Sequence, residues 1–173
     1  MTVTRRRTPP ASAFLGDPGR YYHWDSYEAP LRRDGLAMHE LYLALFAHPP
    51  RGFTELLILR DRIVAPLGLR PSGAADRKPV EVKPAYAVGD KIVRFTLFGQ
   101  NDSEIVSGGD DTHLDFRVSV RKLGDGNGAN RVALTTVVSP HNLLGRTYLA
   151  VILPFHRYGV RMLLANAVEA GRI

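Results

Sequence analysis

The chain has 173 residues, of which 45% are hydrophobic and 23% are charged, a composition that fits one globular domain and excludes a disordered chain. It contains no cysteine, which excludes disulfides, a thiolate nucleophile, thiolate zinc sites and iron–sulfur clusters. The net charge of +6 comes from residues 1–10 and 140–173, each with an excess of +3, and basicity at the two ends argues against a nucleic-acid partner.

The first 20 residues predict a flexible N-terminal arm, followed by a single domain over residues 21–173. The arm carries Arg5, Arg6 and Arg7, but the apolar core of a signal peptide does not follow them. The chain also has no apolar run long enough to span a bilayer. We therefore expect a cytoplasmic protein without an integral membrane segment.

A strand and two helices are predicted for the first part of the domain. The aromatic-rich residues 21–28 favour a strand. Asp34 is the expected N-cap of a helix over residues 35–47, which is apolar on most sides and therefore buried. Apolar residues spaced three and four apart predict a second helix over residues 53–65.

A long loop over residues 70–90, with one short strand near 80–86, leads into an antiparallel meander. From residue 91 onward, apolar and polar residues alternate, which indicates strands with one dry and one wet face. Turn residues separate these strands at Asn101-Asp102, at Asp110-Asp111 and over residues 125–128. The positions that define the dry faces are Val93, Phe95, Leu97, Leu114, Phe116, Val118, Val120, Val132, Leu134, Thr136 and Val138.

A final long helix is predicted over residues 143–169, capped by Asn142 and kinked at Pro154. This helix is the natural cover for the dry face of the sheet. An antiparallel sheet wrapped around one long helix is the helix-grip arrangement of the α+β class. The expected contacts of the helix with the sheet are Leu144, Tyr148, Val151, Ile152, Phe155, Met162 and Leu163.

Five short phrases stand in order along the chain: LILRDRIV at 57–64, DDTHLDFR at 110–117, TTVV at 135–138, HNLLGRTY at 141–148 and PFHR at 154–157. Together they resemble the bacterial domain of unknown function numbered 2867. The resemblance implies a helix-grip fold of the START/SRPBCC-like type, related to polyketide cyclases, and it implies no established activity.

Members of that family stand alone or are fused behind a short-chain-dehydrogenase-like domain. This chain has no Gly-x-Gly-x-x-Gly motif after a strand, so no nicotinamide cofactor is implied, and we expect no other cofactor.

His113 and Asp115 are the candidate catalytic residues, because their spacing on one predicted strand places them on the same face. A histidine that is oriented by an aspartate can act as a general base. The alternative is an ordinary solvated sheet face, on which Arg117 and its neighbours form cross-strand ion pairs.

The candidate ligand-binding residues are Trp24, Arg117, His141, Tyr148 and His156. Trp24 either lines the mouth of a pocket or packs in a core. His141 precedes a helix N-terminus that could hold an anion, although the simpler role of this segment is to cap the helix. Tyr148 and His156 lie on the final helix.

The final helix also carries Arg146, Arg157 and Arg161, which fall near one another on its surface. They could contact an acidic ligand or anionic lipid, and the alternative is a solvated stripe opposite the buried face. The six histidines show no recognised spacing of metal ligands, so no metal site is predicted.

Three functions remain open on this basis. We rank first a binding module for an apolar or amphipathic small molecule, held between the sheet and the long helix. The second is an enzyme that acts on a small or polyketide-like substrate through a His/Asp acid–base pair. The third is a membrane-surface or protein-interaction module, and the sequence is also compatible with a homodimer.

Overall fold

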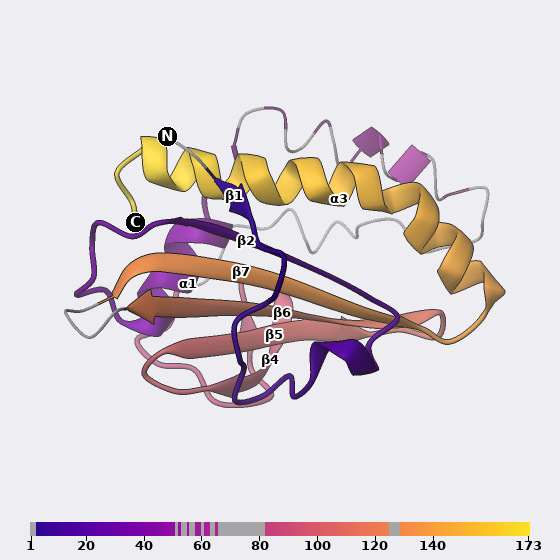
Figure 1. The fold of residues 1–173 in the computed structure, drawn as a ribbon, viewed down its shortest axis with the longest axis horizontal. Coiled ribbons are helices and arrows are strands. Elements are labelled where there is room, and N and C mark those ends of the chain that lie inside the picture. Colours follow the sequence, from indigo (N-terminus) through magenta and orange to yellow (C-terminus); the bar gives the residue numbers. More distant parts are fainter. Residues whose placement is uncertain are drawn as a thin grey trace.

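The computed structural model describes residues 3–50, 82–124 and 129–173, together with the single positions 52, 55, 58, 59, 61, 62 and 65. In this part of the chain, seven strands form one antiparallel sheet in the order β1-β2-β7-β6-β5-β4-β3. The two helices α1 and α3 pack against one face of the sheet, which we call the inner face (Figure 1). The predicted α+β class is confirmed.

The N-terminal elements are β1 (Thr4–Arg5), a short 3₁₀ helix (Pro18–Arg20), β2 (His23–Pro30) and α1 (Met38–Phe46). The strand and the first helix were predicted, but the N-cap at Asp34 is wrong. The cap is Ala37, whose backbone N–H donates to the Glu40 carboxylate at 2.7 Å. A glutamate at the third helical position satisfies this N–H, so the helix begins later than Asp34 would place it.

The meander consists of β3 (Lys91–Ile92), β4 (Phe95–Gln100), β5 (Glu104–Asp110), β6 (Leu114–Gly124) and β7 (Ala129–Pro140). The alternation that begins at residue 91 does not form one strand. Val93 has a φ of 59°, and this left-handed turn folds β3 back onto β4. The short strand predicted near residues 80–86 is absent from the described residues 82–86. The predicted helix over residues 53–65 lies outside the described residues, apart from isolated positions. The predicted turn at residues 125–128 also lies outside them.

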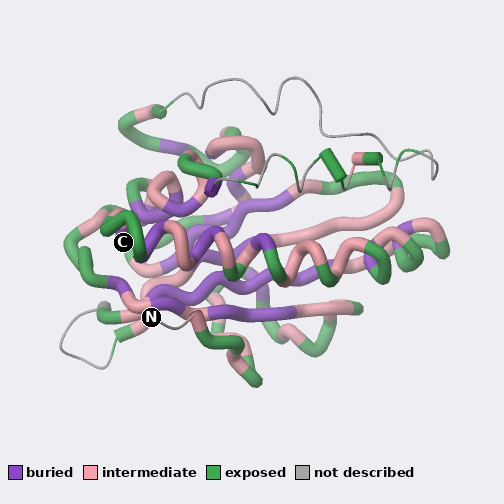
Figure 2. Tube along the Cα trace, turned by 90° about the horizontal axis from the view of Figure 1, so that it is seen from above, coloured by how far each residue is buried: buried purple, intermediate pink, exposed green. Residues whose placement is uncertain are grey.

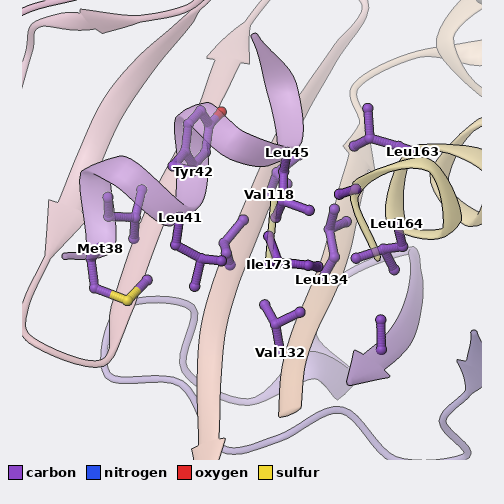
Figure 3. Close-up of a cluster of buried hydrophobic side chains, with 14 of the residues drawn as sticks. Met38, Leu41, Tyr42, Leu45, Val118, Val132, Leu134, Leu163, Leu164 and Ile173 are labelled. Carbon is purple, nitrogen blue, oxygen red and sulfur yellow. The ribbon is translucent and has the colours of Figure 1, made fainter. Parts of the chain in front are cut away.

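The core lies between the inner face, α1 and α3 (Figure 3). Each large apolar side chain that is fully buried here stabilises the fold by roughly 1.5–3 kcal/mol. Two pairs of buried hydroxyl groups are hydrogen-bonded in and around the sheet: Tyr42 with Ser107 at 2.6 Å, and Ser26 with Thr135 at 2.8 Å. The side chains labelled in the figure are Met38, Leu41, Tyr42, Leu45, Val118, Val132, Leu134, Leu163, Leu164 and Ile173.

The opposite, outer face of the sheet is covered by the residues that follow β1 in the segment over residues 3–20, for which the sequence predicted a flexible arm. β1 pairs with β2, and Leu15 packs against Val106 and Val137. The buried Glu104 carboxylate accepts hydrogen bonds from the Ser12 hydroxyl at 2.6 Å and the Ala13 N–H at 2.9 Å. These contacts hold the segment across the sheet.

Helix α3 spans Leu143–Glu169, and the predicted cap is confirmed: the Asn142 side chain accepts from the Gly145 N–H at 2.9 Å. Pro154 lies inside the helix, which bends between its two halves (Figure 1). Buried residues concentrate in its C-terminal half (Figure 2). No helix of the described residues is long and apolar enough to cross a membrane.

The residues of α3 that were predicted to face the sheet differ from the residues that are buried in the structure. Leu163 is buried as expected, but Val151 is exposed and the other expected contacts are half-buried. The bend and two buried glycines change which residues meet the sheet along the helix. The buried residues of α3 are Gly145, Leu149, Gly159, Leu163, Leu164, Ala167 and Val168.

Candidate functional site

A group of polar side chains is buried where β2 passes beneath α3. On β2, His23, Asp25 and Tyr27 point to the inner face, because alternate residues of a strand share a face. Thr136 on β7 lies directly opposite Asp25 in the sheet register. Helix α3 adds its own polar residues from above. We call the set His23, Asp25, Thr136, His156 and Arg157 the Asp25 cluster.

Asp25 is fully buried and lies between two imidazoles. His156 Nε2 donates to its Oδ1 at 3.3 Å. His23 Nε2 lies 3.6 Å from its Oδ2, an electrostatic contact that is too long for a hydrogen bond. The side chains of His23 and His156 are 17% and 28% exposed, so the cluster reaches solvent through its histidines.

The electrostatics of the cluster favour an ionised carboxylate beside a neutral imidazole. Burial raises the pKa of Asp25, but the hydrogen bond and charge of His156 and the proximity of His23 outweigh burial and hold that pKa below its usual value. Burial, with the charges of Arg157 and His156, keeps the pKa of His23 below its usual value in spite of Asp25. His23 is therefore a neutral acceptor or donor at neutral pH.

Four atoms of the cluster are buried and make no hydrogen bond: His23 Nε2, Asp25 Oδ2, Thr136 Oγ1 and Arg157 Nε. Among the described residues, only two other side-chain atoms are in this state, in Arg131 and Arg172. Buried polar atoms are nearly always paired in native proteins, so this concentration at one place is unusual. His23 Nε2 and Asp25 Oδ2 face each other at 3.6 Å, whereas no polar partner of this kind faces Thr136 Oγ1 or Arg157 Nε within the described residues.

The structure does not bring His113 and Asp115 together: no hydrogen bond or ion pair joins them among the described residues. His113 lies in the turn before β6, where its Nδ1 is 3.4 Å from the Asn142 amide. Asp115 pairs instead with His141 at 3.0 Å, and both side chains are about two-fifths exposed.

The remaining candidate residues are distributed over both faces. Trp24 packs against Val137 on the outer face. Arg117, also on that face, pairs with Asp110 and lies 3.6 Å from the centre of the Phe98 ring. Tyr148 is half-buried on α3. Of the predicted binding residues, His156 is the one that contacts Asp25.

The sequence did contain a signal for the residues that were missed. The spacing His-x-Asp occurs twice, at His113–Asp115 and at His23–Asp25. Asp25 stands in an aromatic-rich strand, where an acidic residue on the inner face is unusual. The pattern alone does not show which of the two His-x-Asp segments lies beneath α3.

The cluster contains two imidazoles and one carboxylate, a composition that also occurs at metal sites. Within the described ranges, no group of three or more His, Cys, Asp or Glu side chains has an arrangement that would hold a metal ion. Each imidazole instead approaches a different oxygen of the same carboxylate. The arrangement is suited to hydrogen bonding and proton transfer.

Comparison with known proteins gives a family and no function. A search of curated proteins and a search of solved structures found no match to this chain. The family described as Protein of unknown function (DUF2867) matches residues 18–163, a range that includes every member of the Asp25 cluster. Because the match covers most of the chain, as the resemblance of the five phrases indicated, the protein belongs to the DUF2867 family.

Proposed function

We propose that the protein binds an amphipathic small molecule between α3 and the inner face of the sheet, with the polar end of the molecule at the Asp25 cluster. The observation that carries this proposal is the set of four buried polar atoms without hydrogen-bond partners. Each such atom costs about 1–3 kcal/mol. A ligand that bonded to them would recover much of this free energy.

The topology supports a site at this position. β2, the strand that precedes α1, lies beside β7, the last strand, and α3 then returns along the inner face. We propose that this order is a START/SRPBCC-like helix-grip arrangement, in which a long helix and a curved sheet would enclose the ligand. Apolar residues of the adjoining core are available to the apolar part of the molecule.

Helix α3 has a weak point next to the cluster. Pro154 has no N–H and cannot donate to the carbonyl of Ala150, so the turn before His156 lacks one helical hydrogen bond. A small outward movement of this turn would open a space above Asp25. The partly exposed histidines mark the place of entry.

The test is native mass spectrometry of the full chain after incubation with a small-molecule extract of cells, followed by release of bound molecules on denaturation. We expect wild type to retain an amphipathic molecule and Asp25→Asn to retain much less. The matched control is Asp115→Asn, which removes an exposed carboxylate from outside the cluster. Retention of nothing by wild type, or equal retention by all three proteins, would contradict the proposal.

A second candidate function is acid–base catalysis, and it is favoured by the hydrogen bond from His156 to Asp25. A carboxylate that accepts from one imidazole nitrogen leaves the other nitrogen free to take a proton. This hypothesis assigns the acid–base pair to His156 and Asp25, whereas the sequence pattern indicated His113 and Asp115. Conversion of the retained molecule by wild type, but not by His156→Gln, would establish it.

A further inference from the structure

Three arginines lie on the elements around Tyr27, two residues along β2 from Asp25. Arg5 of β1 is directly opposite Tyr27 in the strand register. Arg157 and Arg161 are one turn apart on α3, which packs against β2, and the charges of all three act on the phenol. Nothing in the described part of the chain forms an ion pair with any of them. Other arginines near the sheet do have carboxylate partners, as Arg131 has in Glu28 at 2.9 Å.

Among the charged groups that act most on Tyr27, three are arginines and one is a carboxylate, Asp25, whose oxygens already face two imidazoles. The Nε of Arg157 is buried without an acceptor. A guanidinium that is partly buried and unpaired attracts an oxyanion strongly, because charge-assisted hydrogen bonds gain strength out of water.

From this arrangement we infer that the ligand of the Asp25 cluster is an acid, whose carboxylate or phosphate binds among Arg5, Arg157 and Arg161 beside Tyr27. The inference rests on the proposed function and specifies the class of ligand.

The geometry of β2 separates the acid group from Asp25. Residues two apart on a strand are about 6.6 Å apart along its axis. An oxyanion beside Tyr27 therefore avoids the Asp25 carboxylate, while an uncharged hydroxyl or carbonyl of the same molecule reaches Asp25 Oδ2 or Thr136 Oγ1. The site thus favours an organic acid that carries a second, neutral polar group.

The test compares probes that differ in the charged group alone: octanoate, octyl phosphate and 1-octanol, titrated into the full chain at pH 7.5 and low salt by calorimetry. We expect at least one of the anions to bind about tenfold or more tightly than the alcohol. The preference should shrink as salt is added, because Arg5 and Arg161 are exposed. The anion that binds with the higher affinity indicates whether the acid group of the ligand is a carboxylate or a phosphate.

The matched variants are Arg157→Gln and Arg146→Gln, which remove the same charge from the same helix. Arg146 lies 5.6 Å from the centre of the Tyr22 ring and about 16 Å from Arg157 along the helix axis, and its variant should keep the preference for the anion. Arg157→Gln should lose most of it with an unchanged circular dichroism spectrum. Equal binding of alcohol and anions by wild type, or equal losses in the two variants, would overturn this inference and leave the proposed function intact. Binding of none of the probes would contradict both.

Discussion

Within the described part of the chain, two carboxylates are fully buried, and they differ in how completely they are hydrogen-bonded. Glu104 accepts from the Ser12 and Ser119 hydroxyls, each at 2.6 Å, and from the Ala13 N–H, with Arg121 at 3.5 Å. Asp25 has one hydrogen bond and one oxygen without any. A buried carboxylate whose hydrogen bonds are all made stabilises the fold. A buried carboxylate that lacks hydrogen bonds and lies beside titratable groups is typical of a binding or catalytic site.

The structural role of Glu104 leads to a prediction about stability. Glu104→Ala removes a buried acceptor and leaves Ser119 and Arg121 without it, so we expect the free energy of unfolding to fall by about 2–4 kcal/mol. Urea denaturation measures this loss. Asp102→Ala, at an exposed position of the same turn, should change it by less than about 0.5 kcal/mol. A loss of the same small size for Glu104→Ala would contradict the structural role.

His23 gives the protein a pH dependence of known sign. Its folded pKa lies below the ordinary value of 6.5, so the unfolded chain takes up this proton first as the pH falls. The contribution of His23 to the free energy of unfolding is therefore fully present above about pH 6.5, and it is lost as the pH falls toward the folded pKa of His23. We expect His23→Gln to flatten the slope of the melting temperature between about pH 7 and 5. The exposed His141→Gln serves as control, and equal slopes for wild type and His23→Gln would show that His23 is not responsible.

At the scale of elements, the ends of α3 were predicted better than its buried face. Both bounds of α3 were correct because Asn142 is a strong N-cap, and apolar residues recur at helical spacing beyond it. The buried stripe was displaced because Pro154 interrupts the helix and because Gly145 allows close approach at a position that periodicity treats as neutral. The hairpin at Val93 was missed because a β-branched residue is rare at positive φ.

Gly145 is required where the first turn of α3 meets the turn before β6. A Cβ at this position would lie 2.0 Å from the carbonyl oxygen of His113, a backbone atom that cannot rotate away. Gly145→Ala should therefore destabilise the protein by about 1–3 kcal/mol, although alanine is the better helix former. Thermal unfolding measures it. Gly35→Ala, where a Cβ would meet nothing within 4 Å, should be close to neutral; equal effects would show that the contact is unimportant.

At the scale of the whole molecule, the sheet is covered on both faces, by helices on the inner one and by the N-terminal segment on the outer one (Figures 1 and 2). The inner layer was predictable, because the dry face of the meander needs a helix. The outer layer was not, because the segment over residues 3–20 has no periodicity and its anchor, Glu104, is distant in sequence. For the same reason, the register that places Asp25 under α3 could not be derived from local pattern.

The outer layer can be tested through the single tryptophan of the chain. Leu15→Ala should lower the free energy of unfolding by about 2 kcal/mol and shift the emission of Trp24 to longer wavelength, because Leu15 covers the apolar cluster beside it. Leu143→Ala, at a position that is 78% exposed, is the matched control and should do neither. Unchanged emission in Leu15→Ala would mean that the segment does not shield this face.

The hydrogen bond between His156 and Asp25 joins residues that are 131 positions apart. During synthesis, β2 therefore leaves the ribosome well before its imidazole partner on α3 exists, and the carboxylate stays hydrated until α3 docks. A nascent chain could not hold the proposed ligand before that moment. A ligand that contacts both β2 and α3 would bind only after α3 has docked. Its presence in the cell would therefore shift the equilibrium from partly folded molecules toward fully folded ones.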